Sequence, residues 1–162
     1  MPADEQSIER LEDIFVEWQP RTLEDRLLYS YWLKYQGRLY LEVPIGGVAG
    51  RGNWPEGSKI RRIDAVRVKD VQEDECSVLS SKSYGEEEFF EFTRGQIVEF
   101  IEVKKKLNRY VTGQIVAGLD MMERQYAPKE IIPVILCKEG DPALEWVCEK
   151  HGIVVKLTDT VY

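Results

Sequence analysis

The sequence predicts an α/β (α+β) protein in which a single mixed β-sheet is flanked by helices on both faces. Three observations lead to this prediction. The chain has 162 residues, the size of one domain. Short apolar segments rich in β-branched residues are separated by segments with the apolar period of a helix. No internal repeat or low-complexity tract divides the chain, so residues 1–162 are interpreted as one domain.

The composition is that of an ordinary globular protein, with 43% apolar and 31% charged residues. No segment approaches the roughly 20 apolar residues of a membrane span, so no contact with a membrane is expected. The N-terminus is acidic and lacks an export signal. Cys76, Cys137 and Cys148 form neither a CxxC pair nor a disulfide framework. A cytoplasmic, reducing location is therefore expected.

The first predicted elements are two helices. Residues 1–20 carry apolar side chains at helical spacing and end at Pro20. A second helix begins at Thr22, which has the spacing of a capping residue with Asp25, and Gly37 follows its end. Its apolar stripe also contains Glu24, which either complements the helix dipole or points into a functional site.

Two strands are predicted next, at residues 39–45 and 59–68. In the second, regular alternation would place Asp64 with Val66 on one side and Ile63 with Ala65 on the other. The connecting segment 46–57 is rich in glycine and is interpreted as a mobile hairpin loop. It lacks the Gly-Lys-Ser/Thr order of a phosphate-binding loop, so no nucleotide cofactor is expected.

Residues 69–95 form an acidic stretch that is long for a plain connection, and we interpret it as an ordered insertion, a lid or an oligomer contact. Within it, SVLS favours an extended conformation and EEEFFEF favours a short helix or strand.

The C-terminal half predicts strands and helices in alternation. The strand 97–106 is followed by a helix capped by Asn108, by the strand 130–138, by a helix opened by Asp141 and Pro142, and by the strand 152–157. On the first of these helices, one face is expected to be buried: Val111, Ile115, Leu119, Met122 and Tyr126.

The strand 97–106 carries the most informative polar residues. Its sequence, IVEFIEVKKK, is apolar on both sides but places Glu102 and Lys104 at the end of a buried strand. Burying these charges is costly unless they pair with each other, with a metal ion or with a substrate. Asp64 raises the same question on the preceding strand, because aspartate is a poor strand former. These residues predict a functional site where the two strands end.

Asp64, followed on the next strand by Glu102-Val103-Lys104, resembles the PD-(D/E)xK nuclease superfamily. The likeness extends over residues 22–157 and implies a restriction-endonuclease-like fold. It further implies that Asp64, Glu102 and the main-chain carbonyl of Val103 bind Mg²⁺ or Mn²⁺, and that Lys104 activates water. Glu24 is similar to the helical carboxylate of the superfamily, and Gln114 to a glutamine of several branches. Ile63 stands where the motif has proline.

The function implied by the resemblance is metal-dependent hydrolysis of DNA by an endonuclease or resolvase-like enzyme, with a homodimer expected for double-strand cleavage. The net charge of −7 opposes nucleic-acid binding over the whole surface. Basic residues nevertheless cluster near the two motif strands and are our candidates for nucleic-acid contacts: Arg51, Lys59, Arg61, Arg62, Lys105, Lys106 and Arg109.

Three alternatives remain open on the sequence. The charged residues of the two strands would also fit a structural ion network. A nuclease-like fold would also serve as a catalytically inactive accessory or interaction module. Finally, the loop from Gly46 to Gly57, with Arg51, Asn53 and Trp54, would suit a small-molecule or nucleotide ligand.

Overall fold

The computed structural model describes residues 20–47 and 51–160. The helix predicted within residues 1–19 lies outside the described residues. Helix α2 spans Leu23–Tyr35 and, as predicted, the Thr22 side chain accepts a hydrogen bond from the Asp25 main-chain N–H. The two following strands form a hairpin, β1 at Arg38–Ile45 and β2 at Arg61–Val68.

The acidic segment 69–95 is structured. It contains the 3₁₀ turn η1 at Glu73–Glu75, the short strand β3 at Ser77–Leu79 and helix α3 at Glu86–Thr93. Strand β3 pairs in parallel with the first residues of β1, so this insertion supplies one edge of the sheet.

The remaining elements follow the predicted order. Strand β4 spans Ile97–Lys106, helix α4 Arg109–Gln125, strand β5 Glu130–Glu139, helix α5 Pro142–Lys150 and strand β6 Val154–Leu157. The strands form one six-stranded mixed sheet in the order β3-β1-β2-β4-β5-β6. The prediction of a mixed α/β sheet with flanking helices is confirmed.

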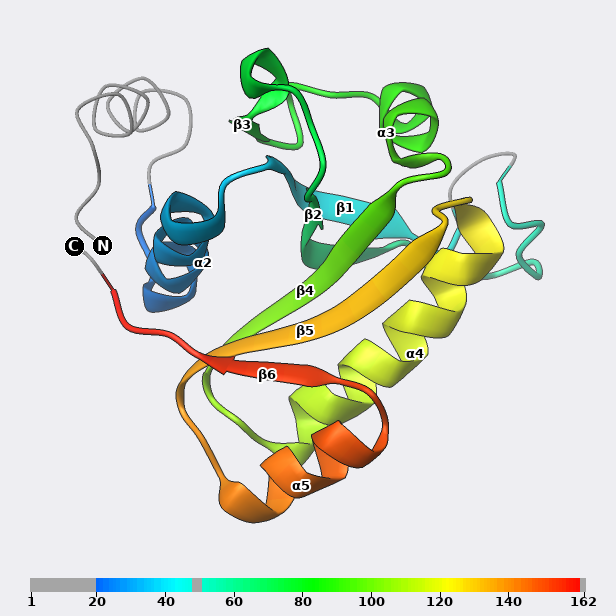
Figure 1. Cartoon of the computed structure of the whole chain (residues 1–162). Helices are drawn as coiled ribbons and strands as arrows, with labels where there is room; N and C mark the ends of the chain where they lie inside the picture. Colours follow the sequence, from blue (N-terminus) through cyan, green and yellow to red (C-terminus); the bar gives the residue numbers. More distant parts are fainter. Residues whose placement is uncertain (1–19, 48–50, 161–162) are drawn as a thin grey trace.

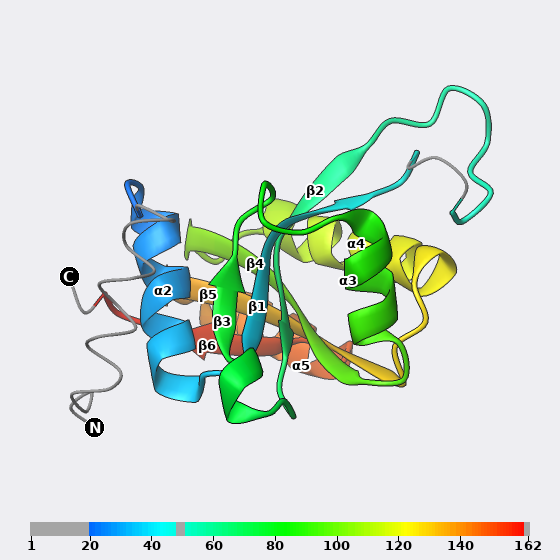
Figure 2. The same cartoon turned by 90° about the horizontal axis from the view of Figure 1, so that it is seen from above.

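The helices divide between the two faces of the sheet (Figures 1 and 2). Helix α2 covers one face, where its apolar side chains pack with Leu39, Ala65 and Ile101. Helices α3, α4 and α5 contribute to the core on the other face, around Phe100 and Ile135. Strand β4 is buried on both faces over most of its length, which explains its nearly continuous apolar sequence.

Helix α4 approaches the sheet closely at Gly118. A Cβ atom at this position would lie 2.5 Å from the Phe100 ring, so glycine is required by the packing. The buried face predicted for this helix is confirmed at Val111, Ile115, Met122 and Tyr126, whereas Leu119 is only half-buried and Gly118 lies in the interface instead.

A buried ion pair lies under helix α2. The Arg67 Nε atom is 2.6 Å from Glu99 Oε1, and both side chains are almost fully buried. The Tyr31 hydroxyl also donates to Glu99, and Arg67 donates to the main-chain oxygen of Gln36. The charges are therefore paired and hydrogen-bonded within the protein, the condition under which buried charges are tolerated.

Within residues 20–47 and 51–160, no helix combines the length and the apolar character that crossing a bilayer requires.

Candidate active site

The sheet forks between β2 and β4. The two strands pair from Val68 with Val98 as far as Ala65 with Ile101. Beyond this point β2 continues only with β1, to the pair of Ile45 with Arg61, while β4 continues with β5. Asp64 and Glu102 are the first residues past the last pair on their strands, so the fork brings together two residues that lie 38 positions apart in the sequence.

The side-chain alternation of β1 and β2 changes at the fork. Ala65 packs on the α2 face, but Ile63 packs with the core on the opposite face. The prediction that Ile63 and Ala65 share one side of the strand is therefore wrong. The same change occurs in β1, where Leu41 packs on the α2 face and Val43 on the other. The intervening Asp64 and Glu42 both line a pocket beside α2.

Asp64 bridges the fork. Its Oδ2 atom accepts a hydrogen bond of 2.8 Å from the main-chain N–H of Val103, a group that no longer has a partner on β2 at this point in the register. The carboxylate thus accepts the hydrogen bond that a main-chain oxygen of β2 would accept if the two strands were still paired. This contact explains why an aspartate is compatible with the end of a paired strand.

Glu102 is buried beside Asp64, with only 8% of its surface exposed. Burial, together with the negative charge of Asp64 and a hydrogen bond between the two side chains, raises the pKa of Glu102 to about 9. The positive charge of Lys104 acts in the opposite direction and lowers this pKa. The two carboxyl groups and the lysine predicted from the sequence therefore interact electrostatically.

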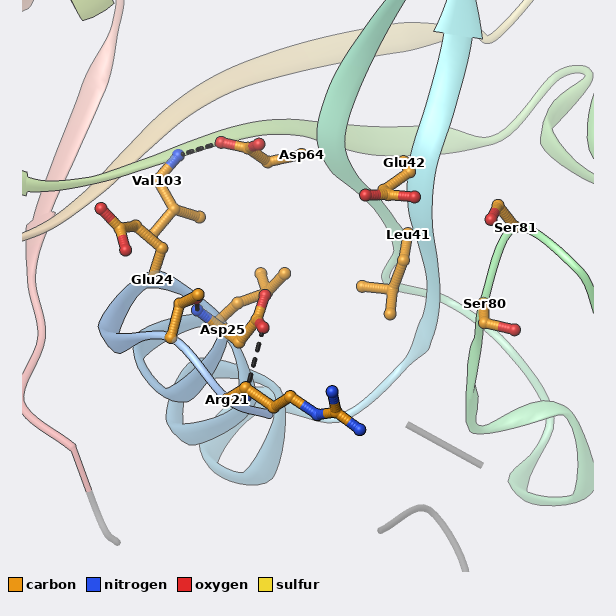
Figure 3. A pocket seen from close by; sticks show the side chains of 11 residues that line it. Arg21, Glu24, Asp25, Leu41, Glu42, Asp64, Ser80, Ser81 and Val103 are labelled. Carbon is orange, nitrogen blue, oxygen red and sulfur yellow. Dashed lines mark hydrogen bonds between the residues drawn. The ribbon is translucent and has the colours of Figure 1, made fainter. Parts of the chain in front are cut away.

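A pocket with a volume of about 380 Å³ opens on the α2 side of the fork. Figure 3 shows Glu24 of α2, Glu42 of β1 and Asp64 of β2 placed around it, with the Asp64–Val103 hydrogen bond at its wall. Glu102 does not line the pocket, although its side chain interacts with that of Asp64, which does. The residues that line the pocket are Arg21, Thr22, Glu24, Asp25, Leu28, Leu41, Glu42, Asp64, Ser80, Ser81 and Val103.

The remaining predicted site residues are placed differently. Glu24 is half-buried and shares the pocket with Asp64, whereas Gln114 on α4 does not line it. The Gln114 Oε1 atom is buried and has no hydrogen-bond partner among the described residues. Lys104 is half-buried at the end of β4, and its Nζ atom lies 5.9 Å from the centre of the Tyr110 ring.

The seven basic candidates fall into three groups. Lys59, Arg61 and Arg62 are exposed on the hairpin of β1 and β2, where the described residues that lead into β2 extend away from the sheet in Figure 2. A second exposed group, Lys105, Lys106 and Arg109, surrounds the turn from β4 to α4. Arg51 stands apart, because it forms ion pairs with Glu86 and Glu87 of α3 and lies over the Phe90 ring.

The loop that follows β1 is anchored to the last turn of α4. Arg124 donates hydrogen bonds to the main-chain oxygens of Gly52 and Asn53, and its guanidinium lies 4.6 Å from the Trp54 ring centre. Trp54 in turn donates to Gln125 Oε1. These contacts attach the described loop residues 51–54 to helix α4.

Glu42 was not among the site residues predicted from the sequence. The structure places it in the pocket with a φ of 50°, in the left-handed region that residues with a Cβ atom rarely adopt. The available signal was a glutamate between the apolar residues Leu41 and Val43. The positions of Ser80 and Ser81 could not be inferred, because their approach depends on the packing of the insertion.

The left-handed conformation of Glu42 leads to a stability prediction. We expect Glu42→Gly to raise the free energy of unfolding by about 1 kcal/mol, because glycine adopts this φ without steric strain. Urea unfolding of the two proteins measures the difference. Glu42→Ala is the matched control, since it removes the carboxylate but keeps the Cβ atom. Equal stability of the glycine and alanine variants would contradict a contribution of backbone strain at this position.

The donor groups at the fork fit a hard divalent cation. Mg²⁺ and Mn²⁺ prefer oxygen ligands, and Mg²⁺ often uses one or two protein carboxylates together with water and substrate oxygens. Asp64 and Glu102 supply two carboxyl groups, and Val103 adds a main-chain oxygen. In the part of the chain that the structure describes, no group of three or more His, Cys, Asp or Glu side chains is arranged to hold a metal, so this set would rely on a pair.

Comparisons of this chain with protein-family models, with curated proteins and with solved structures give no match.

Proposed function

We propose that this protein is a metal-dependent nuclease that hydrolyses phosphodiester bonds in DNA, with Asp64, Glu102 and Lys104 at its active site. The observation that carries the proposal is the position of the two carboxylates, each the first residue past the last β2–β4 pair. The PD-(D/E)xK motif places an aspartate and a glutamate on neighbouring strands of a mixed sheet that is flanked by helices. The position of Asp64 and Glu102 and the sheet of this protein are consistent with that arrangement.

The electrostatics of the pair support a cation site. Burial and the negative charge of Asp64 both oppose ionisation of Glu102, and the raised pKa of Glu102 reflects this conflict between burial and charge. A divalent cation held by Asp64, Glu102 and the Val103 carbonyl would relieve the conflict, offset the charge of the phosphodiester and lower the pKa of the attacking water.

Each of the proposed active-site residues would have a separate role. Asp64 is held in place by the Val103 amide and lines the pocket, where it would bind the ion. Lys104, two residues after Glu102 on the same strand, would place an ammonium group where negative charge develops on the phosphate. Glu24 lies across the pocket from the fork and would orient water by hydrogen bonding.

The proposal is tested by incubating plasmid and branched DNA with the protein and Mg²⁺ or Mn²⁺. We expect metal-dependent cleavage, and a loss of roughly 100-fold or more in rate for Asp64→Ala and for Lys104→Ala. Asp70→Ala and Lys82→Ala are matched controls, because both residues are exposed and neither lines the pocket. Cleavage by Asp64→Ala at the rate of the wild type would refute the proposed site.

An inactive accessory module with the same fold is the second candidate. One observation favours it: Asp64 already uses one oxygen in a hydrogen bond to Val103, as a structural residue would. Calorimetric titration with Mn²⁺ separates the two functions. A nuclease is expected to bind the ion and to lose that binding in Asp64→Ala and Glu102→Gln, whereas a purely structural pair gives no binding that depends on these residues.

A further inference from the structure

Helix α4 begins with an exposed aromatic ring next to the proposed active site. Tyr110 is 70% exposed at the second position of the helix. The Nζ atom of Lys104 lies 5.9 Å from the centre of its ring, within the range of a cation–π contact. Core packing does not explain why a tyrosine stands here, because most of its side chain faces solvent. Its ring lies beside Lys104, the lysine that we assign to the active site.

Three further cations lie within five residues of Tyr110 in the sequence. Lys105, Lys106 and Arg109 are exposed at the turn from β4 into α4. In the described chain, none of the three takes part in an ion pair, whereas Arg38, Arg51 and Arg67 are each paired with glutamate. For a chain with a net charge of −7, an unpaired group of this kind is a local feature and suits an anionic partner.

We propose that Tyr110, Lys105, Lys106 and Arg109 form a docking surface for an unpaired DNA strand, with a base stacked on the Tyr110 ring and phosphates against the three cations. This inference rests on the proposed nuclease function and names its substrate class, DNA with a single-stranded end, flap or fork. An unpaired base leaves its faces free for stacking on an aromatic side chain, whereas a duplex covers them.

The position of this surface relates binding to the proposed chemistry. Lys104 is close enough to Tyr110 for a cation–π contact, so a nucleotide stacked on the ring would hold the neighbouring phosphate near the ammonium group. Lys105 and Lys106 continue the same strand into the exposed turn. The docking surface would thus guide the unpaired strand toward the fork that holds Asp64 and Glu102.

A second exposed aromatic provides a matched control. Trp146 on α5 is 62% exposed, and Lys150 lies 5.3 Å from the centre of its ring. No comparable group of cations lies near it in the sequence, where the neighbouring residues include Glu145, Val147 and Glu149. If any exposed ring with a nearby lysine bound DNA, Trp146 and Tyr110 would contribute equally; the proposed surface predicts that only Tyr110 does.

The test is fluorescence anisotropy of a labelled oligonucleotide, either single-stranded or annealed to its complement, in EDTA so that no cleavage occurs. We expect the wild type to bind the single strand more tightly than the duplex. Tyr110→Ala is expected to weaken single-strand binding roughly tenfold, Tyr110→Phe to retain it, and Trp146→Ala to leave it unchanged. A thermal melt of each variant checks that the exposed substitutions do not alter folding.

The salt dependence tests the role of the cations. Binding to single strands weakens with salt with a slope of about 0.7 per neutralised phosphate, so Lys105→Gln combined with Lys106→Gln is expected to reduce the slope by about 1.4. Unchanged single-strand binding in Tyr110→Ala, or equal or tighter binding of the duplex, would overturn the inference. Because these measurements need no metal, they stay separate from the cleavage assay with Asp64→Ala, which tests the proposed function.

Discussion

Replacing Glu102 with glutamine is expected to stabilise the protein at alkaline pH while removing metal binding and cleavage. The neutral amide keeps the size of the side chain and loses the charge that is unfavourable in its buried position beside Asp64. An increase in stability together with a loss of activity is the combination expected of a residue retained for chemistry. A structural ion pair would behave differently, because its removal would lower stability at every pH.

The direction of the pH dependence follows from the raised pKa of Glu102. In the unfolded chain a glutamate releases its proton near pH 4.3, whereas in the folded protein it does so near pH 9. Between these values the folded state holds a proton that the unfolded state has lost. Stability conferred by this group therefore falls as pH rises, by up to about 1.4 kcal/mol per pH unit, and the loss is complete above about pH 9.

The measurement is urea unfolding of the wild type and Glu102→Gln between about pH 5 and pH 9, both in EDTA. The difference in unfolding free energy between the two proteins isolates Glu102 from other titrating groups. We expect it to grow with pH in EDTA, and we expect it to be smaller when Mn²⁺ replaces EDTA, because the ion stabilises the wild type. A difference that stays constant across this range would show that Glu102 is ionised throughout, which contradicts a raised pKa for this residue.

The second large effect is expected from the ion pair under α2. Arg67→Ala should lower the free energy of unfolding by about 3–5 kcal/mol, because it leaves the buried carboxylate of Glu99 without its cation. Thermal or urea unfolding measures this loss. The double variant Arg67→Met with Glu99→Leu should be much less destabilised than either single truncation, since it removes both charges together.

An exposed ion pair serves as the control for this prediction. Arg94 and Glu91 lie 3.8 Å apart with both side chains more than half exposed, so Arg94→Ala is expected to change stability by less than about 1 kcal/mol. If Arg67→Ala has as small an effect as Arg94→Ala, burial of the Arg67–Glu99 pair does not determine its contribution to the fold.

The sequence predicted most of the fold because local signals agreed with the tertiary structure. Thr22 and Asn108 cap helices α2 and α4 as expected from their side chains, and the pattern of residues 97–106 matches strand β4 at both ends. The edge strand β3 was harder to predict, because its three residues carry too little pattern to separate a strand from an extended loop.

The candidate site was predicted in part. Asp64, Glu102 and Lys104 could be selected because charges at the ends of apolar strands need a reason, and strand order then brings them together. The side on which Asp64 lies could not be predicted. It depends on a change of alternation that β1 and β2 make together at Glu42 and Asp64, and a single strand pattern does not contain that information.

Two long-range pairings could also not be predicted from the sequence. Arg51 was a candidate for nucleic-acid contacts because it lies among basic residues, but folding brings it to the acidic first turn of α3. Arg67 and Glu99 each appear in the sequence as a charge between two apolar residues, and only the register of β2 with β4, where they are direct partners, identifies them as a pair.

The two ends of helix α4 have different surroundings. Its last turn is fastened to the loop that follows β1 through Arg124 and Gln125, and its first turn presents Tyr110. With 17 residues it is about 25 Å long, a length comparable to about seven nucleotide steps along a stacked strand. Because Gly118 packs the middle of the helix closely against Phe100, one contact with the sheet sets the position of both ends.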